Sequence, residues 1–402
     1  MCGICGFAGT SLTQEAARAC LQAMCEVMVH RGPDSDGFWH DGSVGLGMRR
    51  LRVIDLETGE QPIANESDTI RVICNGEIYN YRRLRRDLEA KGHRFRTKSD
   101  VEVLVHLYEE RGEAFVRELE GMFAFALYDA ASGRLILGRD RLGIKPLYYY
   151  WDGRRLVFGS TVQAVVADPS VPRRVNPAAL SLYCSLLYIP EPASIFHDIH
   201  KLPPGHLLIH AGGSFRLHRY WDVEEIARRA PGDDTEAELR ALLKDVVQDH
   251  LVSDVPLGVF LSGGVDSSAV VAMMALGGQE PIKTFSIGFE EEEFNELRYA
   301  RLVSRAFGTD HCEVVLRPDV FSMVDRVVDH LDEPMGDASC IPTYLVSQVA
   351  RSRVTVVLSG DGGDELFGGY DRYHWHRLRE RYRRLPGPVR RALRGAAGWG
   401  GS

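Results

Sequence analysis

The chain has 402 residues, with 48 basic and 56 acidic side chains and a formal net charge of −8. Apolar residues make up 45% of it and charged residues 26%, which is typical of globular protein and excludes a disordered, collagen-like or coiled-coil chain as a whole. The slight acidic excess gives no support to a nucleic-acid partner. At roughly 100–200 residues per domain, this length predicts two domains, or three.

The N-terminus and the cysteines indicate the compartment. The opening Met1-Cys2-Gly3-Ile4 has neither the basic start nor the apolar stretch of a signal peptide, and no apolar run approaches the roughly 18 residues that span a bilayer. Eight cysteines are too few for a disulfide scaffold in a chain of this length. We therefore expect a cytoplasmic protein with reduced thiols and no membrane partner.

Residues 1–165 alternate short apolar runs with two helical patterns, at 15–30 and 81–91. The predicted strands lie at 44–47, 70–74, 123–128, 134–139, 147–150 and 155–160, and a further helix ends near Glu110. Phe123, Phe125 and Leu127 alternate with small residues, so the strand that holds them is expected in the core. Many strands with few helices indicate an α+β domain with antiparallel sheets.

Prolines and glycines crowd residues 171–221, and the polar stretch 228–234 precedes Thr235 and Glu238, which fit a helix-capping box. We place a first domain at 2–210, a linker at 211–234 and a second domain at 235–402. The second domain is predicted to hold, in chain order, helix 236–251, strand 255–261, helix 267–276, strand 282–287, helix 296–307, strand 312–316, helices 319–331 and 344–350, and strand 354–358. This alternation predicts a parallel, doubly wound sheet that binds ligands at the carboxyl ends of its strands.

Two polar loops follow predicted strands of this sheet. The first loop, directly before a helix, consists of Ser262, Gly263, Gly264, Val265, Asp266, Ser267 and Ser268. Its glycines allow an anion to approach the backbone, and the helix start adds free N–H groups, so it predicts a phosphate-binding loop. It lacks the Walker lysine, and Asp266 can orient the loop or hold Mg²⁺. The plainer alternative is a Ser/Gly turn that caps an ordinary helix.

The second loop runs from Ser359 to Glu365 and contains Gly360, Asp361 and Asp364. Since the carboxyl ends of parallel strands share one edge, we expect its carboxylates to meet the first loop and to hold magnesium or a cationic substrate group. A Gly/Asp turn with helix-capping acids is the alternative.

Cys2 is the candidate nucleophile of the first domain. Removal of Met1, which the small Cys2 side chain permits, would leave an α-amine that takes the thiol proton directly or through water. Asn75, beside the Gly76 backbone, provides donors for an oxyanion, and Arg50 can pair with a carboxylate. Glu77 and Asp100 can take an ammonium, so these groups together describe a pocket for a free amino acid. An incidental or buried cysteine is the alternative for Cys2 alone.

These residues resemble a known family, the glutamine-dependent asparagine synthetases. The matching stretches occur in family order at residues 1–6, 30–34, 50–55, 74–80, 138–148, 262–268 and 358–370. The resemblance implies an N-terminal nucleophile (Ntn) hydrolase domain, which is an αββα sandwich and a class II glutamine amidotransferase. It also implies a second, ATP-pyrophosphatase (PP-loop) domain of the adenine nucleotide α-hydrolase-like type.

By resemblance, Cys2 attacks the glutamine side-chain amide while Asn75 and Gly76 hold the oxyanion. Arg50 binds the glutamine α-carboxylate, and Glu77 and Asp100 hold its α-ammonium. The backbone of Leu51, Arg52, Val53 and Ile54 assists Arg50. Ammonia then passes inside the protein to the second domain.

The resemblance also assigns the second site. ATP lies in the 262–268 loop, with Leu261, Ile287, Ser359 and Gly360 around the adenine. Aspartate reacts with ATP to give β-aspartyl-AMP and pyrophosphate, Asp361 acts in catalysis, and ammonia displaces AMP to form asparagine. Asp266 and Asp364 are the candidate Mg²⁺ ligands. Glutamine, aspartate and ATP are thus the expected small-molecule partners, and a homodimer is compatible with the sequence.

Two features depart from the family. Asp361 stands where many members have Glu, which shortens the side chain by one methylene. The family usually continues well past the turn at 368–370, with further substrate-binding residues, so the sequence is expected to be a C-terminally shortened member. Instead, nine arginines lie between Arg372 and Arg394, and they suit a solvated helix face or an anion-binding patch.

Three alternatives stay open at this point. The acceptor can be another carboxylate, such as a peptide or an antibiotic precursor, although the intact set of glutaminase residues argues against a lactam-forming relative. The chain can act as a glutaminase only, or as a non-catalytic interaction protein. Cys2 and Cys5 have a redox or metal-pair spacing, but no second Cys/His pair has zinc spacing, and we expect Cys5 to be buried in a strand.

Overall fold

The computed structural model describes residues 1–226, 235–278, 281–290, 295–316 and 320–396. Its contacts divide the chain into two compact units, residues 1–257 with 316–356 and residues 258–315 with 357–402. The first unit is therefore discontinuous in the sequence. The polar stretch 228–234, residue 319 at the start of one predicted helix, and residues 397–402 lie outside the described residues.

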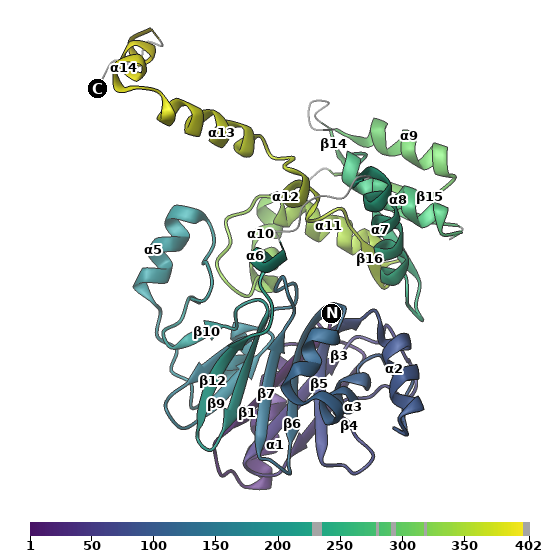
Figure 1. Cartoon of the computed structure of the whole chain (residues 1–402), viewed down its shortest axis with the longest axis vertical. Coiled ribbons are helices and arrows are strands. Elements are labelled where there is room, and N and C mark those ends of the chain that lie inside the picture. The colour runs from purple at the N-terminus through teal and green to yellow at the C-terminus, as the bar shows by residue number, and fades with distance from the viewer. Residues whose placement is uncertain (227–234, 279–280, 291–294, 317–319, 397–402) are drawn as a thin grey trace. The chain divides into compact units, whose positions relative to one another are not determined.

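The first unit contains two six-stranded sheets, in which all neighbouring strands run antiparallel (Figure 1). One sheet has the order β10-β8-β9-β1-β3-β2, formed by Ile199–Lys201, Tyr148–Trp151, Leu156–Gly159, Gly3–Ala8, Val44–Arg50 and Ser35–His40. The other has the order β12-β11-β7-β6-β5-β4, formed by Ser214–Arg219, His206–Ala211, Arg134–Arg139, Gly121–Asp129, Ile70–Ile78 and Ile63–Ala64.

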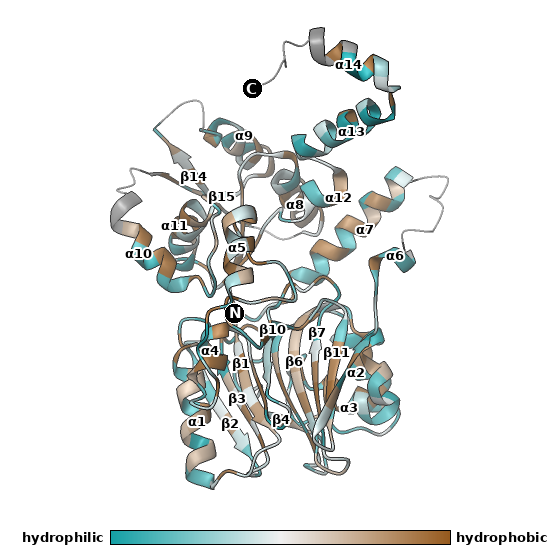
Figure 2. Ribbon diagram, turned by 90° about the vertical axis from the view of Figure 1, so that its left-hand side faces the viewer, coloured by the Kyte–Doolittle hydropathy of each residue, from teal (hydrophilic) through white to brown (hydrophobic). Residues whose placement is uncertain are grey.

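Helices cover the outer faces of the two sheets. Helices α1 (Gln14–Glu26) and α4 (Val162–Ala167) pack on the first sheet. Helices α2 (Tyr81–Ala90) and α3 (Val103–Arg111), followed by the 3₁₀ helix η1 (Gly112–Glu118), cover the second. Figure 2 shows these four layers side by side, with apolar colour in the strands and a largely polar α2. The layers form the αββα sandwich that the family resemblance implies.

Apolar side chains fill all three spaces between the layers. The middle cluster joins residues of both sheets, such as Leu46, Leu137 and Phe158, all fully buried. Phe123, Phe125 and Leu127 are also buried, against α2 and α3, which confirms that their strand is in the core. Cys5 is fully buried under α1, as expected. A packed core of this kind holds the ends of β1, β3 and β5 in fixed positions.

The first unit also includes helices from later in the chain. They are α5 (Pro177–Leu186), α6 (Val223–Ile226), α7 (Thr235–His250), α10 (Val320–His330) and α11 (Cys340–Arg351). After α10, the Asp332 carboxylate accepts the backbone N–H of Val162 at 2.6 Å, at the start of α4. The neighbouring Glu333 pairs with Lys201 at 2.7 Å. These contacts fasten residues 316–356 to the sandwich.

The second unit is built around a four-stranded sheet with the order β15-β14-β13-β16. The strands are Asp310–Leu316, Lys283–Phe289, Leu257–Phe260 and Val356–Leu358, and β13 pairs with β14 in parallel. The helices are α8 (Val265–Leu276), α9 (Leu297–Phe307), α12 (Gly363–Phe367), α13 (Asp371–Arg384) and α14 (Gly387–Ala396). Strands and helices alternate as the sequence predicts, in an α/β fold with its loops at the strand ends.

Two sequence expectations need correction. The helix predicted at 15–30 ends at Glu26, because residues 27–31 form turns ahead of Gly32-Pro33, and a proline disfavours helix before it. The Pro/Gly-rich segment 171–221 is not only loop, since it contains α5 and strands β10, β11 and β12. β12 falls inside the predicted linker 211–234 and pairs with β11. The domain boundaries themselves stay a prediction.

Candidate active sites

A pocket lies in the first unit where β1, β3 and β5 bring their ends together. It is lined by Met1, Cys2, Arg50, Leu51, Val53, Ile54, Gln61, Cys74, Asn75, Gly76, Glu77, Ser99, Asp100, Val101 and Lys145. These residues come from segments almost 150 positions apart, and the sandwich core fixes the strands that carry them. The pocket therefore gathers the predicted Cys2 nucleophile with every predicted partner except Arg52.

The thiol of Cys2 sits against the backbone that follows β3. Leu51 donates its N–H to Cys2 Sγ at 3.3 Å, and the thiol lies 3.6 Å from the Leu51 carbonyl oxygen. Burial raises the pKa of Cys2, while the Leu51 N–H acts in the opposite direction. The thiol is thus neutral at pH 7 and needs a base before it can attack a carbonyl.

Two buried donor groups in this pocket have no hydrogen-bond partner among the described residues. They are Asn75 Nδ2 and Arg50 Nη1, although Nη1 lies 3.3 Å from the Glu60 carboxylate. The other terminal nitrogen of Arg50 donates to the carbonyls of Ile54 and Asp55, at 3.1 and 2.6 Å. Since buried polar atoms are rarely left unpaired, these two donors indicate that a ligand completes the site.

Gly76 follows Asn75 in β5 and has no room for a side chain. A Cβ atom there would lie 2.1 Å from the Met122 carbonyl oxygen in the neighbouring strand. Glycine is therefore required for the close pairing of β5 with β6. This pairing holds the Asn75 amide and the Gly76 backbone in a fixed position beside the thiol.

Two acids line the pocket opposite Arg50. Burial raises the pKa of Glu77 to about 7, with the Asp100 charge adding to the effect. Burial likewise raises the pKa of Asp100 to about 6, against the stabilising hydrogen bond that Ile78 N–H donates to its carboxylate at 2.8 Å. Two desolvated carboxylates close together favour a bound cation. An ammonium group of a ligand meets that requirement.

Some residues near the pocket have other contacts. The Arg52 side chain pairs with the Glu60 carboxylate at 2.6 Å. The backbone N–H of Arg52 donates a hydrogen bond to the Asp34 carboxylate at 2.8 Å. His30 and Asp34, which flank the turn at Gly32-Pro33, are not among the residues that line the pocket. Of the predicted glutamine-binding residues, Arg52 is thus the one whose side chain the structure places outside it.

Sequence reasoning missed several lining residues, among them Gln61 and Lys145. The Gln61 amide oxygen accepts the Cys74 N–H at 2.6 Å, so it braces the strand beside Asn75. Lys145 is buried, and it also lines the pocket. Burial lowers its pKa, and the Glu77 charge acts against that effect. Its place in the matching stretch 138–148 was the available signal for Lys145, and none marked Gln61.

The loop 262–268 in the second unit forms the turn between β13 and α8. Gly263 has a φ of +86°, and a Cβ atom there would lie 2.5 Å from the Ala300 backbone nitrogen, so glycine is required. The hydroxyls are organised around the turn: Ser262 Oγ accepts the Gly264 N–H at 3.1 Å and lies 3.0 Å from Ser267 Oγ. This is a tight strand-to-helix loop at the start of a 12-residue helix, the geometry that binds phosphate.

The loop that follows β16 packs against this turn. A Cβ atom on Gly360 would lie 2.9 Å from the Ser267 nitrogen, and one on Gly363 would lie 2.4–2.7 Å from the Asp266 carboxyl atoms. The expectation that the two loops meet is therefore confirmed. Asp361 is exposed and accepts a hydrogen bond from Ser359 Oγ at 2.8 Å. Beside the loops, Leu261 is buried and Ile287 is half-buried on neighbouring strands.

Comparison with known proteins finds matches for both halves of the chain. Residues 1–221 match the family model of the glutamine amidotransferase domain, and residues 238–399 match that of asparagine synthase. Glutamine-hydrolyzing asparagine synthetase 1 of Bacillus subtilis is 38% identical over 97% of this chain and 62% of its own length. Putative glutamine-hydrolyzing asparagine synthetase 2 of Methanocaldococcus jannaschii is 38% identical over 92% of this chain and 76% of its own length. The chain belongs to the asparagine synthetase family.

As a family member, this chain is short: it spans less than two thirds of the Bacillus subtilis relative. The two family models divide it in the order that the sequence predicts, amidotransferase first and asparagine synthase second. In the described part of the chain, no helix is long and apolar enough to cross a membrane.

Proposed function

We propose that this protein makes asparagine from aspartate, glutamine and ATP. The observation that carries the proposal is the Cys2 pocket, in which a thiol, the unpartnered Asn75 amide, the Arg50 guanidinium and two desolvated acids surround one space. A free glutamine molecule has the complementary groups: an amide carbonyl to attack, a carboxylate for Arg50 and an ammonium for the acids. Family membership supports the second half-reaction.

The first half-reaction is glutamine hydrolysis. With Met1 removed, the α-amine of Cys2 takes the thiol proton, and the sulfur attacks the side-chain amide carbon. The Asn75 amide and the Gly76 N–H stabilise the oxyanion, ammonia leaves, and water cleaves the thioester to release glutamate. Arg50 binds the α-carboxylate with help from the 51–54 backbone. Glu77 and Asp100 hold the α-ammonium.

The second half-reaction takes place at the two loops of the second unit. The loop 262–268 holds the ATP phosphates, while Leu261, Ile287, Ser359 and Gly360 surround the adenine. The side-chain carboxylate of aspartate attacks the α-phosphorus, pyrophosphate leaves, and β-aspartyl-AMP forms. Ammonia then attacks the acyl carbon and AMP leaves, with Asp361 beside the intermediate.

Asp266 and Asp364 are the residues that would hold magnesium. The Asp266 carboxylate lies so close to Gly363 that a side chain on Gly363 would occupy the same space. Asp364 follows Gly363 in the sequence. Carboxylate oxygens are the ligands that Mg²⁺ prefers. The ion, when bound, would neutralise phosphate charge.

The cytoplasmic location, the homodimer, and the domain limits 2–210 and 235–402 also remain proposals.

The alternative acceptors are distinguished from aspartate by the products. We would incubate the full chain with glutamine, aspartate and Mg-ATP and quantify glutamate, asparagine and AMP by mass spectrometry. Equal amounts of asparagine and AMP are expected. Glutamate without either would contradict synthesis from aspartate.

A second arm tests the two-site scheme. Cys2→Ala should abolish the glutamine-driven reaction and leave synthesis from added ammonium, because only the first site needs the thiol. Cys184→Ala, at an exposed free cysteine, is the matched control and should change neither. Equal loss of both reactions in Cys2→Ala would contradict the scheme.

A further inference from the structure

A second cluster of reactive side chains lies in the first unit, apart from the Cys2 pocket. Its members are Glu66 in the turn between β4 and β5, His93 after α2, and His106 and Glu109 on α3. One ligand atom from each lies within 4.8 Å of the others. None of the four lines the Cys2 pocket, and no function discussed above uses them.

The distances within the cluster are those of a metal-ligand set. The Nδ1 atom of His106 lies 3.4 Å from a Glu66 oxygen and 3.3 Å from a Glu109 oxygen. The Nδ1 atom of His93 lies 3.5 and 3.6 Å from oxygens of the same two carboxylates. With ligand bonds of about 2.0–2.1 Å, the edge of a tetrahedral zinc site is about 3.3–3.4 Å. All four nitrogen-to-oxygen distances are close to this edge.

We propose that His93, His106, Glu66 and Glu109 form a binding site for a divalent transition-metal ion, with zinc as the ion that this ligand set suits best. Two imidazoles and two carboxylates are borderline ligands that zinc accepts in tetrahedral geometry. The two carboxylate side chains are 33% and 28% exposed, which leaves the ion a path from solvent, whereas His106 is fully buried.

An outer carboxylate lies within hydrogen-bond distance of His93, and a second lies near the buried far nitrogen of His106, which has no hydrogen-bond partner among the described residues. The far nitrogen of His93, Nε2, lies 3.2 Å from Glu110, and that of His106 lies 3.7 Å from the fully buried Glu102. A carboxylate behind a histidine favours the tautomer with the proton on Nε2, which leaves the Nδ1 lone pair free for a metal. The ligand carboxylates are held too: Glu109 accepts from Asn65 Nδ2 at 2.8 Å and Glu66 accepts the Arg94 N–H at 2.7 Å.

Protons compete with a metal ion for the two histidines. Four carboxylates surround two imidazoles, so either a divalent ion or two imidazolium protons would offset the charge. Burial lowers the pKa of His106, but Glu102 and Glu66 outweigh burial and raise it on balance. At pH values where both imidazoles are neutral, the metal has the advantage, because bound ligands must be deprotonated.

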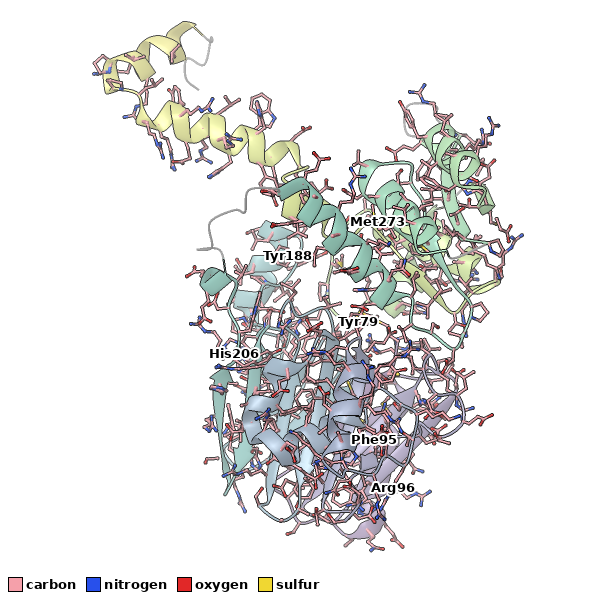
Figure 3. All side chains as sticks on the ribbon, turned by 45° about the vertical axis from the view of Figure 1, so that its right-hand side comes forward. Tyr79, Phe95, Arg96, Tyr188, His206 and Met273 are labelled. Atoms are coloured by element: carbon pink, nitrogen blue, oxygen red, sulfur yellow. The ribbon has the colours of Figure 1, made fainter. Side chains whose placement is uncertain are left out.

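A bound ion would also hold the segment that precedes α3 in place. Residues 94–102 connect His93 to helix α3, which carries His106. In Figure 3 the labelled Arg96 lies toward the lower end of the first unit, whereas Tyr79 lies at its upper end. Glu102 accepts the backbone N–H groups of Arg96 and Thr97 at 2.6 and 2.7 Å. An ion at this place would tie the segment to α3 and to the turn after β4.

The test uses the full chain, stripped with a chelator and kept with reduced thiols. Zinc is titrated by calorimetry, and Co²⁺ serves as a spectroscopic probe. We expect one ion per chain at this site, Co²⁺ d–d bands of tetrahedral type without a sulfur charge-transfer band, and a rise in Tm of a few degrees on zinc addition. His93→Gln and Glu109→Gln should each weaken binding at least tenfold and remove the Tm rise.

Two controls keep the test specific. His197→Gln and Glu15→Gln make the same chemical changes at exposed positions and should leave binding intact. Binding that survives both cluster variants, or that shows a sulfur charge-transfer band alone, would place the metal on cysteines and overturn the proposal. A Tm that responds to pH but not to zinc in the wild-type chain would also overturn it, since the cluster is then an ion-pair network only.

Discussion

The Asp254 carboxylate accepts the backbone N–H of Asp55 at 2.7 Å. Asp254 also donates its own N–H to the Val53 carbonyl at 2.9 Å. The segment 51–55, which lines the Cys2 pocket, is thereby fastened to the residues that lead into β13. Asp55 has a φ of +57°, an uncommon conformation for a residue other than glycine, and this double contact helps to hold it.

Asp254→Ala should therefore loosen the glutamine pocket without touching its chemistry. We expect the KM for glutamine to rise several-fold while kcat changes little, and Asp254→Asn, which keeps an acceptor, to recover most of the loss. Asp245→Ala, an exposed acid on α7, is the control. Steady-state glutaminase kinetics give the answer. A fall in kcat alone would contradict a positioning role for Asp254.

Asn75→Ala tests the unpartnered amide beside Cys2. The loss of one oxyanion donor lowers kcat by about 10²–10³-fold in related chemistry, and we expect a fall of that size with a small change in KM. Asn176→Ala removes an amide at the start of α5 and should leave kcat unchanged. Thermal unfolding must first show that both variants are folded. A large rise in KM with normal kcat would place Asn75 in binding only.

The acidity of the pocket predicts a pH profile for glutamine use. Because the pKa of Glu77 is raised to about 7, the acid gains a proton as the pH falls below that value and its attraction for an ammonium is lost. We expect kcat/KM for glutamine to fall several-fold between pH 8 and pH 6. In Glu77→Gln the value should be lower at pH 8 and the profile flatter. Identical profiles in the two proteins would contradict this assignment.

Asp100→Asn should gain stability as it loses function. The pKa of Asp100 is about 6 in the folded chain and about 3.8 when unfolded, so its contribution to stability is complete below pH 4 and is lost as the pH rises through 6. At pH 8 the variant should be more stable than the wild type by up to about 3 kcal/mol, with little difference at pH 4. Urea unfolding at both pH values measures this. The same difference at pH 4 and pH 8 would refute the electrostatic cause.

Gly363→Ala tests the contact between the two loops of the second unit. The added methyl group would lie 2.4 Å from Asp266 Cγ, so the carboxylate must move. We expect the KM for ATP to rise at least several-fold, with a higher magnesium requirement. Gly387→Ala is the matched control, because a Cβ atom there meets open space. ATP–pyrophosphate exchange gives the readout, and equal values in both variants would argue against a nucleotide site at these loops.

The sequence could predict much of this fold because its patterns are local. The strands and helices of the second unit can be predicted from apolar runs that alternate with helical patterns. The loop 262–268 can be predicted from its glycines and serines. The strand β1 is expected around Cys5, although Gly3-Ile4-Cys5-Gly6 carries no period-two pattern, because all its residues are buried between α1 and the second sheet. The strands β11 and β12 were missed because prolines and glycines nearby were read as loop.

The candidate site was predictable where side-chain chemistry is distinctive and not where packing decides. Cys2, Arg50, Asn75 and Asp100 have chemical roles that their residue types suggest. Gln61 enters the pocket only because it braces Cys74 from the bend before β4, which no local pattern reveals. The Arg52 side chain leaves it because Glu60 is close enough to pair with it. Long-range pairings of this kind exist only after folding.

The discontinuous first unit imposes an order on biosynthesis. Val162 finds its partner Asp332 only after 170 further residues have been made, and Lys201 waits for Glu333 in the same way. A nascent chain on the ribosome can thus stack its two sheets early. Residues 258–315 must be synthesised, however, before residues 316–356 can dock on the first unit. Release of the chain before residue 333 would leave the first unit without these contacts, so its completion has to wait until residues 258–315 have been made.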